Sequence, residues 1–135
     1  MYPDNVMKII QVISYFYPAW SYGGPGKLVY ELTSELVKQH NSVAIFSTDA
    51  FDGFRRRKPN DNQFSGKKNS FKTYFFPNIS NNLAFKTKIF LPYINLFNLV
   101  KEIKSADIVH IHEFFTPLAV LTGILSKRLG KPYLI

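Results

Sequence analysis

The feature that most constrains the fold is the succession of strand, helix and strand in the first 50 residues. Residues 7–13, MKIIQVI, form a short apolar run with β-branched side chains, typical of a strand buried on both faces. Pro25 suits the first position of a helix, and residues 43–47 are a second β-branched run. Between them, apolar residues recur at helical spacing as far as about Gln39: Leu28, Val29, Leu32 and Leu36. This order predicts a βαβ unit and therefore a parallel sheet.

The rest of the chain continues the same alternation. Residues 78–82 are rich in Asn and Ser and indicate a loop, and a helix is expected to begin at Pro92. Thr116 and Pro117 are a good N-cap and first residue for a helix that ends near Leu129, before Gly130. We predict an α/β fold whose strands cover residues 8–13, 43–48, 71–76, 107–112 and 132–135.

Chain topology then predicts where a site lies. With right-handed crossovers, a doubly wound parallel sheet of the Rossmann type has the strand order 3-2-1-4-5. Ligands of such sheets bind outside the carboxyl ends of the strands where the order reverses, here between strands 1 and 4. Two segments meet there: the loop with Tyr22, Gly23 and Gly24, and the end of strand 4 with His112 and Glu113. These five residues are the candidate site.

Gly23 and Gly24 precede the first helix, and two interpretations remain open. Backbone amides and the helix dipole at such a position favour an anion such as phosphate, and glycine lets it approach closely. Alternatively, the loop needs positive φ angles. The common phosphate motifs do not fit, because Val29 replaces the third glycine of a dinucleotide fingerprint and Leu28 replaces the Ser or Thr of a Walker A loop. Asp49, after strand 2, is by itself a weak ribose-binding signal.

His110 and His112 are two residues apart on a strand and therefore share a face. No third metal ligand accompanies them, so no metal site is predicted, and His110 is interpreted as a core residue. His112 ends the strand, where an imidazole can bind a hydroxyl, a phosphate or a developing charge. Glu113 either pairs with a substrate hydroxyl or caps the next helix.

Charge indicates an anionic partner, because the 135 residues carry a net charge of +8. The polar, basic stretch 51–70 is interpreted as an exposed, mobile excursion of a single domain, and residues 1–6 as an extension. The alternative is that this stretch contacts anionic lipid or a phosphate-bearing acceptor. No nucleic-acid-binding module frames the charges, so nucleic acid is not an expected partner. Without cysteines, a signal peptide or an apolar run of roughly 20 residues, we expect a cytoplasmic protein, peripheral at the inner face of the membrane if that stretch meets lipid.

Both ends of the chain resemble one enzyme family. Residues 7–49, MKIIQVISYFYPAWSYGGPGKLVYELTSELVKQHNSVAIFSTD, combine an apolar strand, a Tyr/Pro loop, a Gly-Gly pair, a helix with Glu-Leu repeats and a strand ending in Thr-Asp. Residues 107–135, DIVHIHEFFTPLAVLTGILSKRLGKPYLI, supply a strand, a helix and the next strand. This ordered set is similar to the N-terminal domain of family 4-like glycosyltransferases, whereas residues 51–104 add nothing to the likeness.

The resemblance implies the GT-B architecture, in which two Rossmann-like domains face a cleft. The N-terminal domain mainly binds the acceptor, a glycan or a lipid-linked sugar, and the C-terminal domain binds the nucleotide sugar. By resemblance, Gly23 and Gly24 lie beside the donor phosphates and His112 beside the reacting sugar. Tyr22 and Glu113 are expected among the substrate-binding residues because topology places them at the same crevice. Transfer is expected to be retaining and to need neither a metal nor a cofactor besides the nucleotide sugar.

The sequence departs from the family pattern in two places. His40 and Asn41 stand where the first helix commonly ends in glycine, although Asn41 can adopt a left-handed cap. The chain also stops before the family's donor domain, so we expect a fragment, a broken gene or a half completed by a partner chain, inactive alone. The alternatives are a redox Rossmann domain, which the failed third glycine disfavours, and a non-catalytic basic module that binds nucleotide or membrane.

Overall fold

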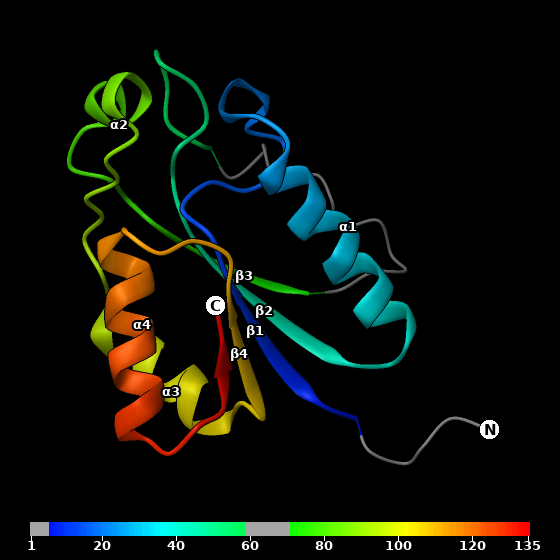
Figure 1. Ribbon diagram of the computed structural model, residues 1–135. Helices are drawn as coiled ribbons and strands as arrows, with labels where there is room; N and C mark the ends of the chain where they lie inside the picture. The colour runs from blue at the N-terminus through cyan, green and yellow to red at the C-terminus, as the bar shows by residue number, and fades with distance from the viewer. Residues whose placement is uncertain (1–5, 59–70) are drawn as a thin grey trace.

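A computed structural model describes residues 6–58 and 71–135 and contains one five-stranded parallel sheet (Figure 1). The strand order is β3-β2-β1-β4-β5, which confirms the predicted Rossmann-like topology. The strands are β1 (Lys8–Val12), β2 (Ser42–Thr48), β3 (Lys72–Phe76), β4 (Ile108–Ile111) and β5 (Tyr133–Leu134). Each agrees with its predicted range to within one or two residues.

The helices cover the two faces of the sheet unequally. They are the single-turn η1 (Trp20–Tyr22), α1 (Pro25–Lys38), α2 (Asn81–Thr87), α3 (Leu96–Ser105) and α4 (Pro117–Arg128). Figure 1 shows α1 on one side of the sheet and α3 with α4 on the other. Side chains therefore alternate between two cores along each strand: Ile10 and Val12 belong to the core with residues of α3 and α4, whereas Ile9 and Ile13 pack with Val29 of α1.

The helix expected at Pro92 begins later, at Leu96. The residues before it are extended: Tyr93 N donates to Pro77 O at 2.8 Å, and Ile79 N donates to Leu91 O at 2.9 Å. Asn95 is the N-cap, and its side chain accepts a hydrogen bond from Asn98 N at 3.2 Å. The predicted start is wrong because pairing with the segment after β3 holds the backbone extended up to an efficient cap.

The helix α2 is not predicted by the sequence, in which residues 78–82 indicate a loop. Ser80 caps it by accepting a hydrogen bond from Leu83 N at 3.2 Å. Ser and Asn favour turns and helix N-caps for the same reason, because their short polar side chains bond to nearby backbone groups. Composition alone therefore does not distinguish a loop from the start of a helix.

The basic stretch 51–70 is described as far as residue 58, and both 59–70 and the extension at 1–5 lie outside the described residues. The expectation of exposure holds for Arg55 and Arg56 but is wrong for Arg57, which is buried. Its guanidinium donates to Phe16 O and Tyr17 O in the loop after β1. Arg56 donates to Asp49 Oδ2 at 2.7 Å. At least two of the cations expected to meet an anionic partner are thus engaged within the domain.

None of the helices within residues 6–58 and 71–135 is long and apolar enough to cross a membrane.

Candidate functional site

The loop after β1 and the end of β4 meet at the point where the strand order reverses. Ser14, just past β1, donates a hydrogen bond from its hydroxyl to Glu113 Oε1, just past β4. His112 N donates to Val12 O at 3.0 Å, which continues the parallel pairing of the two strands beyond their ends. Parallel sheets of this topology bind ligands at this edge. The two segments that the sequence placed at the switch point are therefore in contact just beyond β1 and β4.

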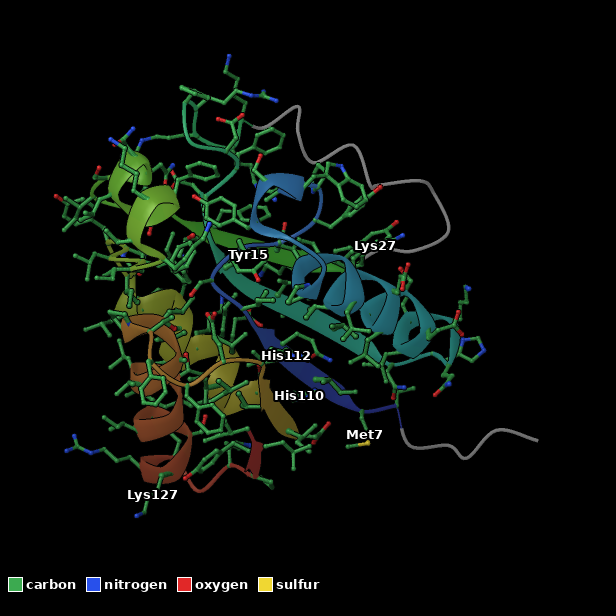
Figure 2. The ribbon with its side chains drawn as sticks, turned by 45° about the horizontal axis from the view of Figure 1, so that its top comes forward. Met7, Tyr15, Lys27, His110, His112 and Lys127 are labelled. Atoms are coloured by element: carbon green, nitrogen blue, oxygen red, sulfur yellow. The ribbon has the colours of Figure 1, made fainter. Side chains whose placement is uncertain are left out.

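Three polar side chains occupy one face of the sheet at this boundary. Gln11 pairs in register with His110, and alternation along both strands places Gln11, His110 and His112 on the α1 side. The two imidazole centroids are 3.9 Å apart, and Gln11 Oε1 is hydrogen-bonded to His112 Nε2. Figure 2 labels both histidines, His110 on β4 and His112 just past its end. Gln11 is 1% exposed, whereas both histidines remain partly exposed. A ligand can therefore reach the two imidazole rings.

Burial keeps this pair of histidines neutral. It lowers the pKa of His110, and burial together with the neighbouring His110 lowers the pKa of His112 from 6.5 to about 4. Because an amide oxygen can only accept a hydrogen bond, we infer that His112 Nε2 carries the proton, which leaves Nδ1 as an acceptor. A neutral ring of this tautomer can receive a hydrogen bond from a hydroxyl group.

Glu113 connects the loop after β1 to the segment between β4 and α4 through hydrogen bonds. Besides the Ser14 hydroxyl, its Oε1 accepts a hydrogen bond from Thr116 Oγ1 at 3.2 Å. Thr116 is also the N-cap of α4, where it accepts from Ala119 N at 3.3 Å. Burial raises the pKa of Glu113, against the opposing effect of these hydrogen bonds. From sequence, Glu113 was expected either to pair with a substrate hydroxyl or to cap the next helix. These contacts favour the role at the helix cap.

Gly23 and Gly24 both lie exposed at the start of α1, with different backbone conformations. Gly23 has φ 103° and ψ −166°, a region that favours glycine, whereas Gly24 has φ −70° and is the N-cap of α1. Within the described residues no side chain caps this helix, and Pro25 follows at its first position. The exposed, uncapped end is suited to an anion. The interpretation of positive φ is correct for Gly23 and does not apply to Gly24.

Tyr22, expected among the substrate-binding residues, has its ring packed inside the loop structure. It is 8% exposed and stacks on Tyr15 with ring centroids 5.1 Å apart. Phe90 and Phe85 complete the cluster, and Lys88 Nζ lies 4.8 Å from the Tyr22 centroid. Burial, with the carboxylates of Asp52 and Asp49, raises the pKa of Tyr22 to about 12. Tyr22 thus shapes the loop and leaves little ring surface for a ligand.

Asp49, the weak ribose-binding candidate, is used inside the domain. It is 8% exposed, and its Oδ1 accepts from Asn78 N at 2.8 Å and from Asn81 Nδ2 at 3.3 Å. Its Oδ2 accepts from Arg56 at 2.7 Å. The carboxylate therefore joins the ends of β2 and β3 to the basic stretch and is not presented to a ligand.

Glu113 also borders a hollow of about 230 Å³ on the opposite side of the sheet from His112. Ile111 and Phe114 line this hollow together with residues of α4 and β5. His112 and Glu113 are consecutive, so their side chains point to opposite faces.

Gln11 and Ser14 are the residues that the sequence analysis missed. A signal for Gln11 was present, because it is the only polar side chain in the apolar run between Ile9 and Ile13. A buried polar group requires a partner, and a histidine at the end of the neighbouring strand is a natural one. Ser14 offered no comparable signal, since serine is common in loops.

Within the part of the chain that the structure describes, no group of three or more His, Asp or Glu side chains is arranged to hold a metal ion. Comparison with protein-family models and with curated proteins found no match to this chain.

Proposed function

We propose that this chain is the acceptor-side half of a glycosyltransferase that takes its sugar from a nucleotide donor. The observation that carries the proposal is the meeting of the β1 loop and the end of β4 at the switch point, with a neutral histidine on one side of the sheet. The β1 loop leads into α1, whose N-terminal end no side chain caps. Sequence resemblance of residues 7–49 and 107–135 to family 4-like enzymes gives the reaction class. The acceptor would be a glycan or a lipid-linked sugar.

The proposed roles follow from the chemistry of each group. His112 Nδ1 accepts a hydrogen bond from a hydroxyl of the transferred sugar and orients it, and Gln11 holds the ring in that tautomer. The start of α1, with Gly23 and Gly24, faces the donor phosphates, where helix amides stabilise the negative charge that develops as the nucleotide leaves. Glu113 and Ser14 keep the two loops at a fixed distance.

A separate unit that binds the nucleotide sugar is part of the proposal. Charge on the departing phosphate is stabilised by donors preorganised on both sides of a closed cleft, and closure also excludes water. The domain described here supplies one wall. We therefore propose that the donor-binding wall comes from further residues of a longer chain or from a partner chain, and that the 135 residues alone do not transfer sugar.

The redox alternative is less well supported. A dinucleotide-binding domain presents an acid after its second strand to the ribose hydroxyls. Here Asp49 is buried and bound to Asn78, Asn81 and Arg56. Releasing it for a ligand would leave buried partners unsatisfied, which costs about 1–3 kcal/mol for each group.

The proposal is tested by deleting the gene and analysing the glycans and lipid-linked sugars of the cell. Deleting the gene in its source organism should remove one glycan or lipid-linked sugar from the cell, and the wild-type gene should restore it. A His112→Ala allele, expressed as a folded protein at the same level, should fail to restore the product. Full restoration by His112→Ala would refute the role of this histidine, and unchanged glycans in the deletion strain would refute the proposed function.

A further inference from the structure

The outer side of α3 carries large apolar side chains that the fold does not cover. Leu99 and Ile103 point into the core and are fully buried, whereas Phe97 is 75% exposed and Leu96 is 54% exposed. A hollow of about 720 Å³ runs along the helix beside Leu96, Phe97 and Val100. Apolar patches of this kind on a soluble domain mark a contact with another molecule or with a membrane.

The segment that leads into α3 also exposes apolar side chains. Ile89, Leu91 and Tyr93 are each exposed, by 52%, 39% and 65% respectively. Figure 1 shows the chain between α2 and α3 running along the same side of the molecule as α3. We call residues 89–97 together with the outer face of α3 the α3 surface.

The charge of this surface is positive. Lys101 and Lys104 line the hollow, and Lys86 is exposed in the last turn of α2. The stretch 77–105 contains one acidic residue, Glu102, which is 4% exposed and bonded to Lys8, Lys72 and Tyr74 inside the domain. The α3 surface therefore presents lysines and apolar side chains with no exposed carboxylate of its own.

We propose that the α3 surface docks on an anionic phospholipid bilayer. Charge complementarity identifies the occupant: apolar side chains beside lysines, with no acid among them, match the acyl boundary and the negative headgroups of such a membrane. Tyr93 and Phe97 enter the headgroup boundary, while Lys101 and Lys104 reach lipid phosphates. This inference does not depend on the proposed sugar transfer. It also differs from the sequence analysis, in which lipid contact was an alternative interpretation of the stretch 51–70.

Binding is tested with a tryptophan placed on the α3 surface. The chain contains a single tryptophan, Trp20, so the Trp20→Phe/Phe97→Trp variant reports from position 97 alone. Vesicles of phosphatidylcholine mixed with phosphatidylglycerol should shift its emission to the blue, and brominated acyl chains should quench it. Vesicles of phosphatidylcholine alone should do so weakly, and added salt should reverse the binding.

Two variants and a control separate this surface from general charge attraction. Lys101→Glu/Lys104→Glu should weaken binding to the mixed vesicles by about tenfold or more. Leu96→Ser/Phe97→Ser should also abolish most of it. The control Lys27→Glu/Lys38→Glu makes the same charge change on α1, across the sheet, and should retain binding close to that of the wild type.

Circular dichroism verifies that each variant is folded, since all the substituted side chains are exposed. Equal binding by the wild type and both α3 variants, or no binding by the wild type, would overturn the proposal. Sedimentation without vesicles decides the remaining case: self-association that Leu96→Ser/Phe97→Ser removes would identify the surface as a contact between copies of this chain.

Discussion

Gln11 and His112, which lie 101 positions apart in the sequence, are joined by a hydrogen bond across the boundary of β1 and β4. Gln11 is buried on β1 beside His110, so its amide oxygen meets the ring nitrogen of His112 with little competition from water. A buried amide that accepts a hydrogen bond from an imidazole selects one tautomer of the ring. The protonation behaviour of His112 should therefore depend on residue 11.

We expect the imidazole of His112 to titrate near pH 4, because burial and then the nearby His110 disfavour its charged form. In the Gln11→Glu variant a carboxylate faces the ring and favours the charged form, so the pKa of His112 should rise. Gln11→Met removes the acceptor at similar volume and should mix the two neutral tautomers. NMR of the ring nitrogens measures both effects. Identical spectra for His112 in Gln11→Met and wild type would show that Gln11 does not select the tautomer.

The same pKa makes stability depend on pH. The folded-state pKa of His112, about 4, is below its ordinary value of 6.5, so between these values the unfolded chain binds more protons. The contribution of His112 is therefore present above pH 6.5 and is lost as pH falls towards 4. In His112→Asn, the free energy of unfolding measured in urea should decline less over this window. Parallel curves for variant and wild type would contradict the lowered pKa.

Glu102 should stabilise the domain through its network. Burial by itself would raise the pKa of Glu102, but hydrogen bonds from Tyr74, Lys8 and Lys72 outweigh it and lower the pKa from 4.5 to about 2. Stability from this carboxylate is thus present above pH 4.5 and lost as pH falls through 2. Glu102→Gln should cost on the order of 1–3 kcal/mol at neutral pH, with the two unfolding curves converging near pH 2.

The control for Glu102 is Glu35→Gln, which breaks an exposed pair with Lys38 and should change stability by less than about 0.5 kcal/mol. Equal effects of the two substitutions would show that burial of the Glu102 network contributes nothing.

Gly23 and Gly24 should respond differently to alanine. Gly23 has φ 103°, so an added Cβ is strained there and should cost about 1–3 kcal/mol of stability. A Cβ on Gly24 meets nothing within 4 Å, and its φ is ordinary, so Gly24→Ala should leave stability nearly unchanged. Thermal unfolding of both variants measures the difference. If the proposed donor phosphates approach Gly24, its alanine variant should lose transfer activity in the complete enzyme while staying stable.

Ser14 and Glu113 should be coupled energetically. Removing the Ser14 hydroxyl leaves a partly buried carboxylate with one donor fewer, so Ser14→Ala should cost about 1–3 kcal/mol and raise the pKa of Glu113 further. A double-mutant cycle with Glu113→Gln gives the coupling. Additive effects of the two substitutions would mean that this contact does not hold the two loops together.

Much of the fold follows from local sequence signals. Short runs rich in apolar residues predicted the five strands, and Pro25 and the Thr116–Pro117 pair predicted where α1 and α4 begin. The strand order followed from the handedness of crossovers, which is set by the chirality of the residues. The strands and the helix starts depend on neighbours a few positions apart, so local sequence patterns predict them directly.

Tertiary structure decided which polar groups meet. Gln11 pairs with His112, Glu102 with Lys8, and Arg57 with the backbone of the β1 loop, each across tens of residues. Such partners depend on strand register and on where loops dock, which no local pattern contains. The start of α3 was decided in the same way, because pairing near Pro77 extended the residues before it. Sequence alone thus determined the sheet and the edge at which a site is proposed, and long-range hydrogen bonding determined which side chains lie there, because a buried polar group takes whichever partner the assembled fold brings within reach.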